Sequence, residues 1–183
     1  MSLSNIIEIV KEKLSEKRFN HSYNVMLKCE ELAVIYGMNV DKAKLIGIAH
    51  DIAKELSTEE MFSYIKENNI VVDEIEQKCT WLLHGKIGAV MCKKNFGYDD
   101  DMARTIEIHT TGDINMTLFD KVLFVADYIA DDDNLSLDNF KNLDSLVLEI
   151  LNLKIKKNLK KEAIIHIRSI EARNNIIENM LNN

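Results

Sequence analysis

Hydrophobic residues recur every three or four positions through most of the chain, a spacing that places them on one face of an α-helix. The first run contains Ile6, Val10 and Leu14, and later runs keep the same period. Cap signals such as Ser57-Thr58-Glu59-Glu60 separate the runs. The pattern predicts a bundle of about eight helices. The clearest ranges are 4–17, 20–36, 41–54, 57–67, 74–83, 87–96, 99–109 and 117–130, and after an acidic loop at 131–138 one or two long helices end near 181.

The chain has no proline and only six glycines among its 183 residues. These residues are the strongest signals of tight turns, so their scarcity argues against a β-sandwich and against linker-rich or collagen-like chains. The length suits one domain of ordinary size, and no repeat or linker divides the sequence. We therefore expect an all-α protein with a single domain over residues 1–183. Its core at about 15–130 carries the motifs described below, and C-terminal helices occupy about 136–181.

Charge and cysteine usage narrow the functional classes. With 23 basic and 30 acidic side chains, the net charge of −7 disfavours nonspecific nucleic-acid binding. The segment Lys154–Arg173 is locally basic, which is typical of a solvated helix face or of a rim that attracts phosphate. The three cysteines show no pairing pattern, the N-terminus does not resemble a signal peptide, and no apolar run approaches a membrane span. These features predict a cytoplasmic protein that binds neither nucleic acid nor membrane.

Ionisable residues interrupt the least polar segments of the sequence. His50 and Asp51 close the apolar run of the third helix range, and Asp127 stands alone within residues 122–130. Removing a carboxylate from water costs several kcal/mol unless a cation or strong hydrogen-bond donors meet it. A lysine or arginine would serve, but neither run contains one before Lys54. A metal ion would serve both aspartates.

Four of the five histidines share this apolar setting: His21, His50, His84 and His109. Each one alone is more typical of a hydrogen-bonded core histidine, and we leave His166 in that class. Together with the two aspartates, the four favour a mono- or dinuclear metal site inside the helical bundle. Imidazole and carboxylate ligands suit iron, manganese or zinc, and iron is a good match for mixed nitrogen and oxygen ligation.

Five short motifs follow one another in a characteristic order. They are Arg18-Phe19-Asn20-His21-Ser22, Gly47-Ile48-Ala49-His50-Asp51-Ile52-Ala53-Lys54, Leu83-His84-Gly85, His109-Thr110-Thr111-Gly112 and Val125-Ala126-Asp127-Tyr128-Ile129. In these motifs and their order, residues 15–130 resemble the YqeK family of HD-domain symmetrical bis(5′-nucleosyl)-tetraphosphatases. The resemblance implies an HD-type helical fold and a phosphohydrolase that cleaves diadenosine tetraphosphate into two molecules of ADP with a metal-activated water.

The resemblance also implies roles for individual residues. An iron ion, or manganese or another divalent transition metal, would be ligated by His21, His50, Asp51 and Asp127. Asp51 would bridge two ions or accept a proton from the attacking water. His84 and His109 would complete a second metal position, or would hold the phosphates and the nucleophilic water.

Substrate phosphates also need cations other than the metal. Lys54 lies three residues after Asp51, so a continuous helix would place both on one side. Arg18 lies three residues before His21, and the same argument applies. Each of the two cations is equally consistent with an ordinary surface position. The other candidates for substrate binding are His84, His109, Thr110 and Thr111, of which the threonines also suit a helix end, and Arg173 in the basic segment.

Two places depart from the family pattern. Asp113 stands where the family often has a basic residue. Ala130-Asp131-Asp132-Asp133 stands where the family usually has Glu-Pro and, two positions on, an arginine. If that arginine contacts the ligand, the change of charge weakens polyphosphate binding, whereas the metal centre is expected to be unaffected.

Other functions remain open from the residues alone. One is a different HD phosphohydrolase that acts on mononucleotides or on guanosine polyphosphates. Another is a nucleotide-binding protein that senses a ligand without turning it over, and a third is a purely structural helical module. The number of metal ions, one or two, and the choice between a monomer and a homodimer are open as well.

Overall fold

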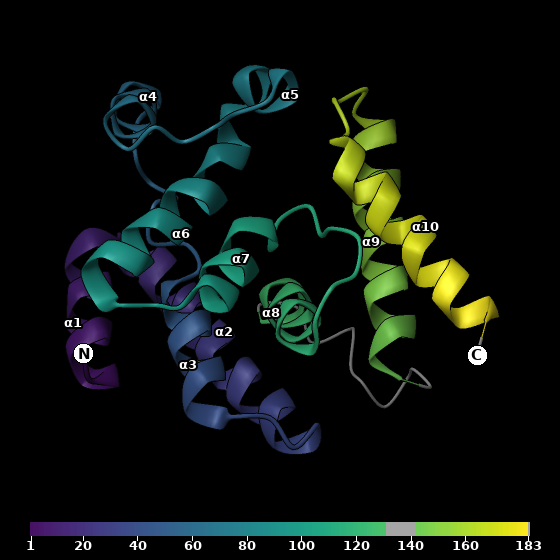
Figure 1. Ribbon diagram of the computed structural model, residues 1–183, viewed down its shortest axis with the longest axis horizontal. Helices are drawn as coiled ribbons and strands as arrows, with labels where there is room; N and C mark the ends of the chain where they lie inside the picture. The colour runs from purple at the N-terminus through teal and green to yellow at the C-terminus, as the bar shows by residue number, and fades with distance from the viewer. Residues whose placement is uncertain (131–141, 183) are drawn as a thin grey trace.

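The computed structural model describes residues 1–130 and 142–182, which contain ten α-helices, one short 3₁₀-helix and no strand (Figure 1). The predicted all-α class is therefore confirmed. The elements are α1 (Leu3–Lys13), α2 (Glu16–Ile35), α3 (Val40–Ala49), α4 (Thr58–Glu67), α5 (Glu74–Lys78), η1 (Thr80–Leu82), α6 (Leu83–Phe96), α7 (Asp100–Ile108), α8 (Leu118–Ile129), α9 (Leu143–Lys160) and α10 (Ile167–Leu181). The predicted acidic loop and Asp131-Asp132-Asp133 lie outside the described residues.

The boundary between the first two helices differs from the prediction. The chain turns at Ser15, whose side chain accepts the N–H of Arg18 and thereby caps α2. The Ser15 backbone N–H and hydroxyl both donate to the Glu55 carboxylate, each over 2.6 Å. This contact between distant parts of the chain holds the turn. Arg18 and His21 consequently lie on the same helix, one turn apart.

The third helix also ends earlier than predicted. α3 stops at Ala49, and residues 50–55 follow as tight turns. Within these turns the Lys54 N–H donates to the Asp51 carbonyl over 2.8 Å. In a turn of this i→i+3 type, residues three apart lie on the same side. The predicted proximity of Lys54 to Asp51 is therefore realised by a turn that follows the helix.

Helix α8 occupies the middle of the molecule (Figure 1). It packs against α2, α3 and α7 and, on its other side, against α9, which pairs with α10. Its side chains from Val122 to Ala126 are all buried, as expected for a helix that is apolar nearly all round. Buried residues of α9 and α10 belong to the same hydrophobic cluster as those of α1 to α4 and α6 to α8. The assignment of residues 1–183 to one domain stays a prediction.

Two glycines allow pairs of helices to approach closely. A Cβ atom on Gly47 of α3 would lie 2.8 Å from the Met26 Cα on α2. A Cβ atom on Gly85 of α6 would lie 2.6 Å from the Glu107 carbonyl oxygen on α7. Any other residue would force these helices apart. The two close contacts matter because each helix pair carries histidines of the site described next.

No helix among the described residues combines the length and the apolar character that a membrane crossing requires.

Candidate metal centre

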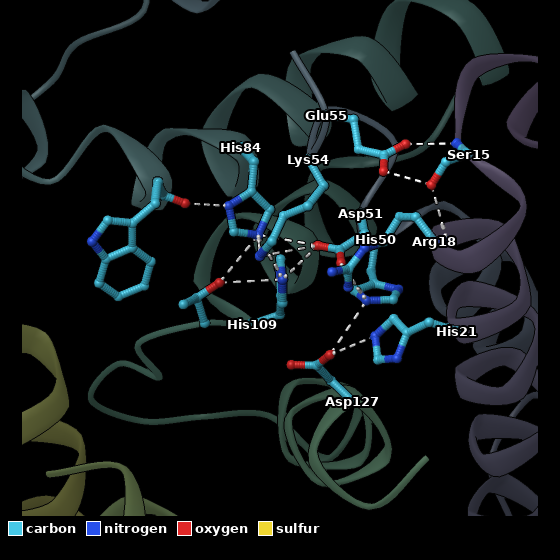
Figure 2. A network of polar contacts seen from close by, with 12 residues as sticks. Ser15, Arg18, His21, His50, Asp51, Lys54, Glu55, His84, His109 and Asp127 are labelled. Atoms are coloured by element: carbon cyan, nitrogen blue, oxygen red, sulfur yellow. Dashed lines mark hydrogen bonds and ion pairs between the residues drawn. The ribbon is translucent and has the colours of Figure 1, made fainter. Parts of the chain in front are cut away.

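Six of the predicted site residues converge between the helices (Figure 2). They come from five separate elements: His21 from α2, His50 and Asp51 from the end of α3, His84 from the start of α6, His109 from the end of α7, and Asp127 from α8. His21 Nε2 lies 3.1 Å from Asp127 Oδ1, and His84 Nε2 lies 3.1 Å from Asp51 Oδ1. The two histidines His84 and His109 approach each other to 3.1 Å between their Nε2 atoms. The structure thus brings together residues that are spread over more than a hundred positions of sequence.

Backbone carbonyls fix the orientation of three imidazole rings. The Nδ1 atom of His50 lies 2.8 Å from the Gly47 carbonyl oxygen. His84 and His109 make the same contact, over 2.6 Å, with the carbonyl of the residue three positions earlier. Since a carbonyl oxygen only accepts, each Nδ1 must carry the proton. In the neutral ring the lone pair then resides on Nε2, and all three Nε2 atoms face the centre of the cluster.

Two atoms that face the centre of the cluster, His50 Nε2 and Asp51 Oδ1, lack a hydrogen-bond donor in the part of the chain that the structure describes. His50 Nε2 lies 3.5 Å from Asp51 Oδ2 and 3.4 Å from Asp127 Oδ1. Both it and Asp51 Oδ1 are buried and have no hydrogen-bond partner among the described residues. Lone pairs that face one another in a buried space are costly. A cation would turn these repulsive contacts into attractive ones.

The donor set fits a divalent metal ion. One ligand atom each from His21, His50 and Asp127 lies within 4.8 Å of the others, and the same holds for His50, Asp51 and His109. His50 belongs to both groups, so one ion beside it is within reach of imidazole nitrogens and of two carboxylates. The Nδ1–H···O=C bond of His50 is the kind of supporting contact that orients a histidine ligand of a metal.

Two cations lie on the Asp51 side of the cluster. Arg18 NH1 donates to Asp51 Oδ2 over 3.0 Å. Lys54 Nζ lies 3.6 Å from Asp51 Oδ1 and 3.0 Å from His84 Nε2, an acceptor because its ring carries the proton on Nδ1. Both cationic side chains keep about a third of their surface exposed, so an anion from solvent can reach them. The side of the cluster that carries His21 and Asp127 faces α8 instead (Figure 2).

Burial and neighbouring charges set the protonation states of the cluster. Burial raises the pKa of Asp51, but His50, His109 and His84 more than offset this and hold its pKa well below the usual range. Burial also raises the pKa of Asp127, but hydrogen bonds with His21 and His50 outweigh this and keep its pKa well below the usual value. Burial lowers the pKa of His109 to about 4, although Asp51 acts in the opposite direction. At neutral pH the two aspartates are ionised and His109 is neutral.

The lowered pKa of His109 predicts a specific loss of stability in acid. The unfolded chain binds this proton at about pH 6.5, whereas the folded protein binds it at about pH 4. Between these values the unfolded state holds more protons, so the free energy of unfolding of the metal-free protein falls as the pH drops from 6.5 to 4, by up to ~3 kcal/mol from this residue. Urea denaturation at pH 7 and at pH 4.5 measures the effect. The variant His109→Gln should show a smaller loss, and an equal loss in both proteins would contradict the assignment.

The two predicted threonines differ in their placement. The Thr110 hydroxyl lies 3.3 Å from His84 Nε2 and 3.2 Å from His109 Nε2, so it belongs to the cluster. The Thr111 hydroxyl donates to the Gly112 carbonyl over 2.8 Å and stays at the helix end. Gly112 has a positive φ of 68°, which suits a chain reversal there.

Arg173 and Asp113 are held by other partners. Arg173 Nε donates to Asn152 over 2.7 Å, and its NH1 contacts Asn174, so the structure does not bring this arginine to the cluster. Asp113 lies 3.8 Å from the Arg104 guanidinium. The negative charge of Asp113 is therefore paired with a positive charge of the protein itself, that of Arg104.

Lys154 is a cation beside the cluster that the sequence analysis did not single out. It donates to the Thr110 carbonyl over 3.3 Å, and its ammonium group lies 4.1 Å from the centre of the Phe124 ring. Burial lowers its pKa, and Asp127 acts in the opposite direction. Its position in the sequence could have revealed this placement. Lys154 follows the buried Val147, Ile150 and Leu151 at helical spacing and so continues the buried face of α9.

A second group with metal-ligand spacing lies apart from this cluster. His166 Nε2 lies 2.9 Å from Asp73 Oδ2, while its Nδ1 accepts the N–H of Arg168. Glu76, the third member, receives the Lys86 ammonium over 2.6 Å. Because a lysine already supplies the positive charge, this group acts as a structural contact between α5 and the start of α10.

Comparisons with known proteins agree with this geometry. The HD domain model matches residues 18–132. The symmetrical bis(5′-nucleosyl)-tetraphosphatase of Halalkalibacterium halodurans is 37% identical over 130 residues, which cover 70% of this chain and 69% of the relative. The enzyme of the same name from Staphylococcus aureus is 29% identical over 183 residues and covers 95% of this chain and 94% of the relative. A crystal structure of a predicted HD superfamily hydrolase involved in NAD metabolism from Clostridium acetobutylicum superposes with a TM-score of 0.90 at 32% identity and covers 98% of both chains. The chain belongs to the HD-domain family and is homologous to the symmetrical bis(5′-nucleosyl)-tetraphosphatases.

Proposed function

We propose that this protein hydrolyses diadenosine tetraphosphate symmetrically to two molecules of ADP, at a metal ion held by His21, His50, Asp51 and Asp127. One observation carries the proposal. Buried His50 Nε2 and Asp51 Oδ1 face the centre of the cluster with no hydrogen-bond partner among the described residues, in a chain homologous to enzymes named for this reaction. A cluster that is left electrostatically incomplete by its own side chains is typical of a binding centre and costly in a purely structural one.

The chemistry of the ligands favours iron, with manganese as the alternative. Two imidazoles and two carboxylates form a mixed nitrogen and oxygen set, which suits these metals better than an all-oxygen or all-sulfur set would. When bound, such an ion lowers the pKa of a water molecule and polarises a phosphoryl oxygen.

We propose one ion rather than two. A second position would need the Nε2 atoms of His84 and His109. His84 Nε2 already accepts from the Lys54 ammonium, and the Thr110 hydroxyl lies within hydrogen-bond distance of both atoms. Lys54 and Thr110 thus already provide the hydrogen-bond donors that these two Nε2 atoms need, so the atoms do not require a second ion.

The remaining residues of the cluster bind and orient the substrate in this proposal. Lys54 and Arg18, which are partly exposed, neutralise negative charge on the tetraphosphate. Neutral His109 accepts a hydrogen bond through Nε2 and holds the attacking water. Asp51 serves as an anchor for these groups, because a carboxyl with so low a pKa is a poor proton acceptor.

Hydrolysis breaks one phosphoanhydride bond and forms one bond between phosphorus and the oxygen of a water molecule. The water oxygen forms a bond to the second phosphorus atom from one end of the chain. The bond from that phosphorus to the central bridging oxygen breaks, the water releases its proton to solvent, and both products are then ADP. The leaving oxygen carries the negative charge, which Lys54 is placed to stabilise.

Product analysis tests the proposal. The iron-loaded protein is incubated with diadenosine tetraphosphate, and the products are separated by chromatography. ADP as the sole product supports the proposal. ATP together with AMP, or no turnover beside rapid hydrolysis of a mononucleotide, would contradict it, and the latter result would favour a nucleotidase. His50→Ala should lose both its metal and the activity.

A cytoplasmic location is part of the same proposal. All three cysteines, Cys29, Cys79 and Cys92, are buried and free, as expected in a reducing compartment.

A further inference from the structure

A cavity of about 230 Å³ adjoins the metal centre. It lies between η1, the end of α7, the α9 helix, and the segment that leads into α10. The cavity and the cluster share Thr110, whose hydroxyl contacts His84 and His109 while the residue also lines the cavity. Lys154 lines the cavity too and donates to the Thr110 carbonyl. A molecule bound at the cluster can therefore extend into this space.

The walls of the cavity suit a flat, largely apolar group. Trp81 forms one side with about half of its surface exposed, and Leu82, Ile155 and Ile164 contribute aliphatic surface. An aromatic face that is open to solvent is a favourable surface for a nucleobase to stack on, at roughly 1–3 kcal/mol per base as measured by alanine substitution.

Polar residues also line the cavity. Asn158 and Ser169 are among them. An asparagine amide offers both a donor and an acceptor, so it can pair with the edge of a purine, and a serine hydroxyl can pair with a ribose hydroxyl. Lys154 stands at the boundary with the cluster, where the phosphates of a bound nucleotide would pass.

The size of the cavity sets how much of the substrate it accepts. Pockets for ligands of drug size enclose about 300–1,000 Å³. At about 230 Å³ this cavity is smaller, so it suits one nucleoside and not a whole dinucleoside tetraphosphate.

We propose that this cavity binds one nucleoside of the substrate, with its base against Trp81, while the second nucleoside remains outside. This inference rests on the proposed function and adds the residue that recognises the base. Because either end of a symmetrical substrate can enter, one nucleoside site is enough to place the bond between the two central phosphates at the cluster in the same way.

Tryptophan fluorescence gives a direct test, since Trp81 is the only tryptophan in the chain. ADP is titrated into the metal-loaded protein, and inorganic pyrophosphate is titrated in parallel as a probe with phosphates but no base. The proposal predicts a saturable change of Trp81 emission with ADP and little change with pyrophosphate. Equal changes with both probes would overturn it, as would the absence of any change at ADP concentrations that inhibit hydrolysis.

Kinetics of two Trp81 variants give a second readout. Trp81→Ala should raise the KM for diadenosine tetraphosphate about tenfold and leave kcat within about twofold. Trp81→Phe, which keeps an aromatic face, should restore most of the affinity. In both variants the backbone carbonyl that holds His84 remains, so the cluster keeps its geometry.

Leu159→Ala is the matched control, because Leu159 is an exposed apolar residue of α9 that does not line the cavity. An unchanged KM in Trp81→Ala, or an equal rise in Leu159→Ala, would overturn the proposal while the hydrolytic function stands. Conversely, a protein that does not hydrolyse the tetraphosphate but whose Trp81 responds to ADP and not to pyrophosphate would retain the nucleoside site without the proposed function.

Discussion

Replacing Asp51 with asparagine is expected to lower kcat by about 10³-fold and to reduce the metal content of the purified protein. Metal polarisation contributes several kcal/mol to phosphoryl transfer, which corresponds to a rate change of this size. Asp51 also connects the parts of the site, since Arg18, Lys54 and His84 all contact its carboxylate. Its loss therefore affects both the metal and the groups that bind phosphate.

The same substitution should leave the metal-free fold intact. An asparagine amide can donate to the Nε2 atoms that face Asp51 Oδ1, so it relieves the contact between lone pairs. The midpoint of thermal unfolding of the metal-free variant is expected to stay close to that of the metal-free parent, because the amide gains donors toward these Nε2 atoms while Arg18 and Lys54 lose a negative partner. Metal analysis, steady-state kinetics and thermal denaturation of both proteins are the measurements.

Asp41→Asn provides the control, at an exposed position near the start of α3, the helix that precedes Asp51. It should retain the metal and the activity. Full metal content and full activity in Asp51→Asn would refute the proposed ligand set, and a large drop in metal-free stability would refute the argument about facing lone pairs.

Replacing Lys54 with methionine is expected to lower kcat/KM for diadenosine tetraphosphate by about 10²-fold without changing the metal content. Loss of one positioned donor from a site of developing charge commonly costs about 10²- to 10³-fold. Methionine retains much of the length of lysine and removes the charge and the N–H donors of the ammonium group, whereas the backbone hydrogen bond of the turn at residues 50–55 remains. The comparison requires kinetics and metal analysis on the same preparation.

Lys66→Met is the control, because Lys66 is an exposed residue of the last turn of α4. Its kinetics should match those of the parent protein. If Lys54→Met loses metal in proportion to activity, Lys54 supports the metal centre and does not bind phosphate. A kcat/KM within twofold of the parent would exclude either role.

The sequence predicted the identity of the cluster better than the ends of the helices. Helical spacing and cap residues located the helices, and the isolated Asp127 and the histidines in apolar runs pointed to a common centre. The break at Ser15 was not predicted because it depends on Glu55, forty residues later in the chain. Local periodicity carries no information about such a contact.

The sequence pattern also could not predict which single polar residues near the site contact the cluster. Thr110 and Thr111 are adjacent and chemically identical, yet only Thr110 reaches the histidines. Lys154 appeared as one charge among many in a basic segment, and its approach to Thr110 depends on how α9 packs on α8. Arg173, a weaker candidate from the same basic segment, instead binds Asn152. Tertiary packing decides between such residues.

The carbonyl contacts of the imidazole rings place a constraint on helix length. The last carbonyls of a helix lack intrahelical donors, and His50 and His109 supply donors to carbonyls in the last turns of α3 and α7. The same hydrogen bond therefore satisfies a carbonyl at the end of each helix and orients the imidazole ring. Adding a single residue before either histidine would turn it by about 100° around the helix axis. The inner ends of α3 and α7 are therefore fixed in register to the residue.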